Sequence, residues 1–392
     1  MSQGQTAVPA SLNLAGYVLG AYLGVLADRI GRRRALIIAI LIQGPASLLT
    51  GLSWDVASFT IFRALTGIGT GALLAIVVTY IAELAPGAKR GRYTQYAIVF
   101  AGVSHAVTGL VGAGLVALSP GYGWRALFAV GAMILLLLPV MAVLRLPESP
   151  RWLVLRGRGA EADVIVSRWE HSLGRDHLLP VPEPAPSEPA SDAMPVRQLL
   201  RRPYLGRLVV VLAYWLIWYL WVYGFLGFSS LLFVDMGHAP TASVLYVALG
   251  ELGALASTAL PLFLVDRVER KYLITAMLVM GGSGLLVIAT SSGATGLIVG
   301  SLITIAVTSG GSLAFGYTAE IFPTQARASG MAVADGFGHL SGVVAPMLVV
   351  GLVGTVSARG IFGIWAALAF AGGLLILAAG RRTQGTLTEV AR

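Results

Sequence analysis

Long apolar stretches alternate with short polar intervals along nearly the whole chain. A helix crosses the hydrocarbon core of a bilayer with about 20 residues, at a rise of about 1.5 Å per residue. Eleven stretches of suitable length occur, at roughly 7–26, 35–53, 57–81, 93–117, 123–144, 208–233, 241–264, 272–290, 295–318, 330–354 and 358–380. A soluble domain with a single core does not need such runs. The pattern therefore predicts an all-α, multi-pass membrane protein.

Two polar phrases between these stretches are each written twice. The phrase with Tyr80, Glu83, Pro86 and Arg90 returns at an offset of 237 as Tyr317, Glu320, Pro323 and Arg327. The phrase with Asp28, Arg29, Arg32 and Arg33 returns at an offset of 238 as Asp266, Arg267, Arg270 and Lys271. Such a repeat predicts two pseudo-symmetric helical bundles, an arrangement typical of secondary transporters.

The repeat also sets the expected domain boundaries. We expect an N-terminal bundle at 1–144, a connecting region at 145–207, a C-terminal bundle at 208–380 and a tail at 381–392. The helix at 208–233 has no partner in the first half, because an offset of 238 places that partner before residue 1. Eleven helices rather than twelve therefore indicate a miscalled or incomplete start, with a real truncation as the alternative.

The connecting region breaks the apolar pattern. Residues 151–175 predict one or two short amphipathic helices on the membrane surface. Residues 178–195 are rich in Pro, Glu, Ala and Ser, which cannot bury a core and indicate a flexible linker.

Composition and charge agree with a membrane protein. The chain is 56% hydrophobic and 11% charged, with a mean hydropathy of +0.81. Its net charge of +9 results from 27 basic and 18 acidic residues. Among the basic residues, Arg125 and Arg359 lie in loops on one side, and Arg63 lies within a helix. The others lie on the opposite face or in the tail, which predicts a cytoplasmic basic face and C-terminus in the cell membrane rather than binding to nucleic acid.

Other chemistries find no support in the sequence. Five histidines without any cysteine show no metal-ligand spacing, so we expect neither a metal nor another cofactor. A phosphate-binding Gly-x-x-x-x-Gly-Lys loop is absent, so ATP does not drive transport. Either an ion gradient supplies the energy, or the carrier is a uniporter. We expect a monomer whose partners are a small-molecule substrate, protons and the lipid bilayer, and we expect no enzyme activity.

Several motifs together carry a family resemblance. GVLADRIGRR at 24–33 resembles the signature loop after the second helix of the major facilitator superfamily, and PESPRWL at 147–153 is similar to the segment after the sixth helix in its sugar-porter and organic-ion branch. Arg63 with Gly67, Gly69 and Gly71 completes the pattern; we expect these glycines to allow close helix packing.

The resemblance implies a major facilitator fold that works by alternating access. The charged motif residues can pair at the cytoplasmic helix ends and latch one bundle to the other in one conformer; charges that merely set topology are the alternative. The candidate latch residues are Asp28, Arg29, Arg32, Glu83, Arg90, Glu148, Arg151, Asp266, Arg267, Arg270, Glu320 and Arg327.

The substrate is expected to be a small organic ion, either an aromatic or other organic acid or an organic cation. The glutamine that is typical of hexose carriers in the fifth family helix is replaced by Ile98, and the seventh family helix is aromatic. Trp215, Tyr219 and Tyr223 share one face of that helix, which suits stacking on a ring or a cation. Packing or an interfacial belt is the alternative for this face.

Ionisable residues inside membrane helices are functional candidates, because charge in hydrocarbon is costly. Glu251 is the first candidate for a proton carrier, and it competes with direct binding of a cationic substrate. Asp335 and His339 form an i, i+4 pair in which His339 titrates near neutral pH. His105 is a candidate for substrate contact, with ordinary helix packing as the alternative.

The sequence therefore predicts a secondary active transporter for a small organic ion, coupled to protons. A sugar or drug carrier of the same superfamily is the second hypothesis. A membrane receptor, scaffold or truncated remnant without transport activity is the hypothesis from another class.

Overall fold

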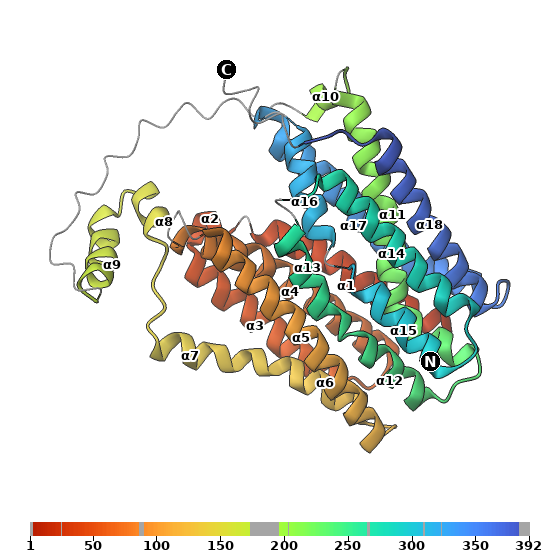
Figure 1. Cartoon of the computed structure of the whole chain (residues 1–392). Coiled ribbons are helices and arrows are strands. Elements are labelled where there is room, and N and C mark those ends of the chain that lie inside the picture. The colour runs from red at the N-terminus through yellow and green to blue at the C-terminus, as the bar shows by residue number, and fades with distance from the viewer. Residues whose placement is uncertain are drawn as a thin grey trace. The chain divides into compact units, whose positions relative to one another are not determined.

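The computed structural model describes residues 3–24, 26–85, 90–172, 196–202, 204–264, 267–308, 310–322 and 324–383. Figure 1 shows these residues almost entirely as helices. Among them the β pairing is limited to an isolated bridge between Val353 and Val356. The prediction of an all-α protein is confirmed.

The first half of the chain contains helices of membrane-spanning length and shorter ones. They are α1 (Gln3–Gly24), α2 (Ala27–Ile30), α3 (Arg32–Gly51), α4 (Val56–Leu84), α5 (Arg90–Leu118), α6 (Gly123–Gly131), the 3₁₀ segment η2 (Ala132–Leu136) and α7 (Leu137–Val143). The start of α4 is fixed by a capping box, in which Asp55 accepts a hydrogen bond from the Ser58 amide at 2.7 Å.

Two short helices, α8 (Pro150–Leu155) and α9 (Gly159–Ser172), follow where amphipathic helices were predicted. Ser149 caps α8 and Pro150 occupies its first turn. The predicted linker at 178–195 lies outside the described residues.

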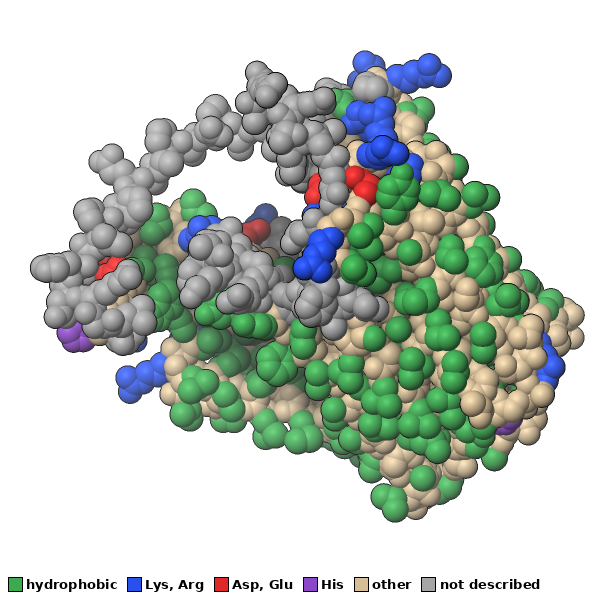
Figure 2. All heavy atoms as spheres, in the orientation of Figure 1, with side chains coloured by type: hydrophobic (Ala, Val, Ile, Leu, Met, Phe, Trp, Pro, Cys, Tyr) green, Lys and Arg blue, Asp and Glu red, His purple; other side chains and the backbone are tan. Residues whose placement is uncertain are grey.

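The second half begins with the short α10 (Val196–Leu199). The remaining helices are α11 (Tyr204–Asp235), α12 (Pro240–Gly250), α13 (Gly253–Leu264), α14 (Arg270–Thr290), α15 (Ala294–Ile305), α16 (Gly310–Ile321), α17 (Thr324–Leu352) and α18 (Ala358–Ala379). In Figure 2, hydrophobic side chains spread over the surface of α12, α14 and α15, while Lys and Arg side chains gather near α10.

Nine apolar spans among the described residues are long enough to cross a membrane, and two shorter apolar helices, Ala294–Ile305 and Gly336–Leu352, accompany them. Each of the eleven predicted stretches coincides with one of these helices. The predicted stretch at 295–318 is short in the structure because it is divided into α15 and α16.

The described helices group into two compact units. One contains Met1–Ser11, Ile98–Trp124 and Asp192–Arg392, and the other contains Leu12–Ala97 and Arg125–Ser191. Most of α5 therefore belongs with the helices of the second half. The boundaries at 144 and 208, which follow the sequence repeat, stay a prediction.

In the second unit, α1 and α4 approach closely through glycine. A Cβ atom at Gly67 would collide with the carbonyl of Asn13, and one at Gly71 with the carbonyl of Tyr17. Gly69 lies against Gln43 of α3 in the same way, with 2.5 Å to its Cβ atom. The prediction that these glycines allow close helix packing is confirmed.

Candidate functional site

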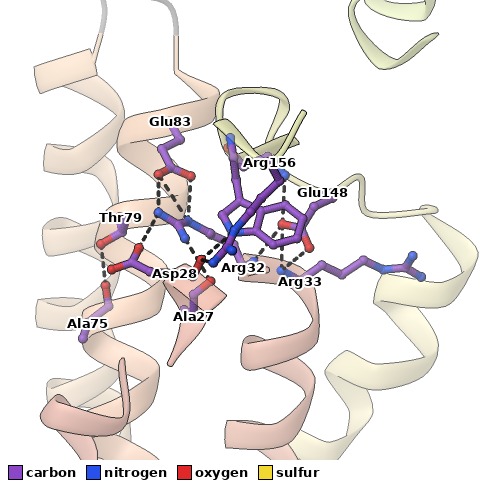
Figure 3. Close-up of polar contacts among 11 residues, drawn as sticks. Ala27, Asp28, Arg32, Arg33, Ala75, Thr79, Glu83, Glu148 and Arg156 are labelled. Atoms are coloured by element: carbon purple, nitrogen blue, oxygen red, sulfur yellow. Dashed lines mark hydrogen bonds and ion pairs between the residues drawn. The ribbon is translucent and has the colours of Figure 1, made fainter. Parts of the chain in front are cut away.

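Arg32, at the start of α3, joins three helices through one guanidinium group (Figure 3). Its Nε and Nη2 atoms donate to the Glu83 carboxylate of α4 at 2.7–3.2 Å, and Nη2 lies 2.8 Å from an oxygen of Asp28 in α2. The Arg32 and Glu83 side chains are only 7% and 15% exposed, so the charge-assisted hydrogen bonds between them are largely shielded from water, whereas Asp28 is exposed.

Glu148 completes this first charge cluster at the N-terminus of α3. One of its oxygens accepts from the amides of Arg32 and Arg33, at 2.8 and 3.2 Å. Unpaired amides and the helix dipole favour a carboxylate at this position. Gly31 has φ +98°, and a Cβ atom there would collide with the Glu148 carboxylate. The motif after the sixth family helix therefore folds back onto the signature loop.

The repeated residues in the other unit form a second charge cluster. Arg270, at the start of α14, lies 2.9 Å from Glu320 of α16, the counterparts of Arg32 and Glu83. Glu269 accepts from the Thr383 amide at 2.6 Å, and Lys271 donates to the Gly380 carbonyl at 2.8 Å. The segment after α7 is thus held at the start of α3, and the segment after α18 is held in the same way at the start of α14.

The predicted latch is only partly visible in the described residues. Arg29, Arg151 and Arg267 are exposed, and none of their side chains forms an ion pair with a described residue. Asp266 and the side chains of Arg90, Arg327 and Asp335 lie outside the described part. The described pairs join helices within one unit, so a latch between bundles stays a prediction.

Glu251 lies at an interruption inside an apolar span. The span Pro240–Thr258 divides where α12 ends at Gly250 and α13 begins at Gly253. Across the interruption, hydrogen bonds run from Leu252 to Leu249 at 3.3 Å and from Ala254 to Glu251 at 2.9 Å, three residues apart instead of four. A Cβ atom at Gly250 would lie 2.5 Å from that of Ser301 in α15.

The structure places Glu251 against the face of α5 that carries His105, although the sequence treated the two residues as separate candidates. A Cβ atom at Gly109 of α5 would lie 3.1 Å from Cγ of Glu251, and His105 is within electrostatic reach of the Glu251 carboxylate. The imidazole Nδ1 of His105 lies 3.0 Å from the Ala101 carbonyl. Glu251 is half-buried and His105 is exposed.

Two glycines contribute to this site and were missed in the sequence. Gly102, which would meet Thr258 of α13, and Gly109, which meets Glu251, lie seven residues apart with His105 between them. This spacing places all three on one face of α5. The pattern of two glycines and a histidine on one face was the signal that could have found the site.

The aromatic residues of α11 form a continuous stack. The rings of Trp215, Tyr219 and Tyr223 follow one another at centroid distances of 5.3 Å. Trp215 and Tyr219 are covered by α17, where a Cβ atom at Gly338 would lie 2.7–2.9 Å from both side chains. Tyr223 is the member of the stack with partial exposure. A role in substrate contact stays a prediction for all three.

His339 of α17 extends this stack. Its ring lies 4.3 Å from the ring of Tyr219 and 6.4 Å from that of Tyr223, centroid to centroid, and it is 8% exposed. The predicted interaction with Asp335 lies outside the described side chains.

Among the described residues, no group of three His, Cys, Asp or Glu could hold a metal ion.

Comparison with known proteins places the whole chain in one family. The family model for "Sugar (and other) transporter" matches residues 2–389. The putative metabolite transport protein YyaJ of Bacillus subtilis is 31% identical over 338 residues, which is 85% of this chain and 74% of YyaJ. The niacin transporter NiaP of Acinetobacter baylyi is 26% identical over 387 residues, 97% of this chain and 86% of NiaP.

A solved structure shares the fold. The partially occluded, inward-open structure of the xylose transporter XylE from E. coli superposes with a TM-score of 0.72 and 20% identity, covering 98% of this chain and 90% of XylE. XylE is described as a major facilitator superfamily proton:xylose symporter. The chain belongs to the sugar (and other) transporter family of the major facilitator superfamily, whose members are membrane transporters and not enzymes.

Proposed function

We propose that this transporter moves a small aromatic carboxylate across the cell membrane together with protons, by alternating access. The observation that carries the proposal is the position of Glu251 at the interruption between α12 and α13, within reach of His105. Transporters commonly bind substrates and ions where a membrane helix is interrupted. An ionisable group at the same point is a functional candidate.

Histidine supports a carboxylate as the substrate. His105 is within electrostatic reach of Glu251, and His339 lies beside the aromatic stack. A protonated imidazole is a hydrogen-bond donor and a counter-ion for a carboxylate. Tyr223 is the partly exposed member of the stack, and we propose that it contacts the aromatic ring of the substrate. The similarity to a niacin transporter points to the same chemical class, since niacin combines an aromatic ring with a carboxylate.

We propose that Glu251 and His105, which are within electrostatic reach of each other, together couple transport to protons. In this proposal, an ionised Glu251 and a substrate carboxylate compete for the same cationic partner, a protonated imidazole at His105. When Glu251 takes up a proton, His105 becomes available to the substrate. Proton and carboxylate therefore enter together and leave together, which is symport. Direct binding of a cationic substrate by Glu251 is the competing role.

The two charge clusters are proposed to bias the conformational equilibrium. Within each unit they hold helix ends together, through Arg32 with Glu83 and Arg270 with Glu320. Exposed members such as Asp28 remain available for a partner in another conformer. We further propose that the basic face and the C-terminal tail are cytoplasmic and that the carrier is a monomer.

Uptake by proteoliposomes that contain the purified full-length chain tests this proposal. We expect labelled nicotinate to accumulate when the lumen is alkaline, and benzoate to compete. Nicotinamide has the same ring without the carboxylate and serves as the matched control, which should compete poorly. Competition by xylose but not by benzoate would favour the sugar carrier. If the protein neither binds nor takes up any of these compounds, the hypothesis of a protein without transport activity is favoured.

A further inference from the structure

A cavity lies at the helix ends that bear the first charge cluster. It has a volume of about 900 Å³ and lies among the start of α3, the end of α7, and the helices α8 and α9. All of its lining residues belong to one compact unit. Neither Glu251, His105 nor the aromatic stack lines it, so it is distinct from the proposed transport site.

Arginine side chains approach this cavity from three directions. Arg34 comes from α3, Arg145 follows the end of α7, and Arg168 lies on α9. All three are exposed, and no described residue forms an ion pair or a side-chain hydrogen bond with any of them. Unpaired guanidinium groups that converge from several elements favour a phosphate, which accepts bidentate hydrogen bonds.

The carboxylates of the same cavity are already engaged. Glu148 accepts the amides at the start of α3. Glu161 accepts two hydrogen bonds from Arg158, at 2.6 and 2.7 Å, and these bonds lower the pKa of the Glu161 carboxyl. Neither acid is therefore free to neutralise the three arginines, and the cavity keeps a net positive charge.

The remaining walls are apolar and continue into the membrane-spanning helices. Ile37, Leu146 and Val164 line the cavity. Arg145 comes directly after the apolar span Gly123–Val143, and Val143 and Leu144 before it are 80% and 71% exposed. The cavity therefore lies where a span leaves the hydrocarbon, with exposed apolar side chains on its membrane side.

We propose that this cavity binds the headgroup of an anionic membrane phospholipid. Its phosphate pairs with Arg34, Arg145 and Arg168, and its acyl chains follow the apolar wall toward the exposed side chains of Val143 and Leu144. A soluble phosphate compound matches the arginines but not the apolar wall, so the lipid is the occupant that fits both. The lipid then ties α9 to α3 through charges that the protein leaves unpaired.

The test measures bound lipid on the purified full-length chain. The protein is reconstituted in nanodiscs or exchanged through detergent, and retained phosphatidylglycerol is counted by native mass spectrometry beside phosphatidylcholine. We expect wild-type protein to retain phosphatidylglycerol preferentially. The triple variant Arg34→Gln/Arg145→Gln/Arg168→Gln should lower its apparent affinity at least about ten-fold, because each basic residue near a membrane surface contributes measurably to anionic lipid binding.

Matched variants separate the site from general surface charge and from misfolding. Arg197→Gln/Arg201→Gln/Arg202→Gln removes the same number of exposed arginines outside the cavity and should retain the lipid. The corresponding triple Arg→Lys variant of the cavity keeps the charge and should recover much of the binding. Three results would overturn the proposal. The two triple Gln variants could lose phosphatidylglycerol to the same extent, or the wild-type protein could retain phosphatidylcholine as well as phosphatidylglycerol. Millimolar glycerol 3-phosphate could also displace the bound lipid.

Discussion

Glu251, at the end of α12, is in contact with Gly109 of α5, and the contact exists because residue 109 has no side chain. A Cβ atom there would lie 3.1 Å from Cγ and 3.3 Å from Cβ of Glu251. The carboxylate is therefore held beside α5, on the face that also carries His105. A small residue on one helix thus fixes the position of a membrane-embedded acid on another.

The contact predicts that residue 109 controls transport. Gly109→Ala should reduce proton-driven uptake and Gly109→Val should reduce it further, because overpacking at a tight contact typically costs about 1–3 kcal/mol. The measurement is initial uptake per folded molecule. Gly114→Ala in the same helix is the matched control, since nothing lies within 4 Å of its added Cβ atom. Equal uptake by Gly109→Val and wild type would contradict the placement of Glu251.

The first charge cluster predicts a large effect on stability from one residue. Arg32→Gln leaves Glu83 without its cationic partner, and removal of one member of a buried pair costs roughly 3–5 kcal/mol. The thermal midpoint in detergent should fall strongly. Arg29→Gln is the control, because that side chain is exposed and has no ion pair among the described residues.

Asp28 separates stability from conformational bias in the same cluster. Its side chain is 64% exposed, and an exposed ion pair contributes only about 0–1 kcal/mol. Asp28→Asn should therefore leave the thermal midpoint nearly unchanged but lower uptake per folded molecule, if the latch acts in another conformer. Unchanged uptake would mean that these charges only set topology.

The aromatic stack predicts different effects from its two ends. Tyr223→Ala should raise the apparent KM for an aromatic carboxylate by the loss of one stacking contact, about 0.5–1.5 kcal/mol. Trp215 is 1% exposed, so Trp215→Ala should mainly lower stability, by about 3–5 kcal/mol. Uptake kinetics and thermal melts of both variants check this. Equal loss of stability in both would place Tyr223 in packing alone.

The capping box of α4 predicts that the local stability of the first turn of this helix depends on pH. Hydrogen bonds from the side chain and amide of Ser58 lower the pKa of the Asp55 carboxyl. Its stabilisation is therefore present above the unfolded-state pKa, about 3.9, and is lost as the pH falls through the lower folded-state pKa. Hydrogen exchange at the first turn of α4 should accelerate in acid. Asp55→Asn should remove this dependence.

The sequence predicted those features that depend on local composition and on repetition. Long apolar runs are sufficient to define membrane helices, and all eleven stretches coincide with apolar helices. The repeat marked Arg32 and Glu83, with their counterparts Arg270 and Glu320, as charged candidates in both halves. The specific pairs, which lie within one unit each, were not predicted from it.

Other features depend on packing between distant segments and could not be predicted. The interruption at Glu251 lies beside the close approach of Gly250 to Ser301, and glycine is common in uninterrupted membrane helices as well, so the sequence contained no signal for it. The burial of Trp215 also escaped prediction, because an aromatic residue is equally suited to a substrate site and to packing against Gly338. The proximity of His105 and Glu251 required the tertiary structure.

Counterflow and gradient-driven uptake in one Glu251→Gln preparation test the central claim most directly. If Glu251 carries the coupled proton, the variant should exchange labelled for unlabelled nicotinate across the membrane, yet fail to accumulate it when the lumen is alkaline. Loss of exchange as well would indicate direct substrate binding by Glu251. Accumulation at the wild-type level in the Glu251→Gln protein would contradict a coupling role.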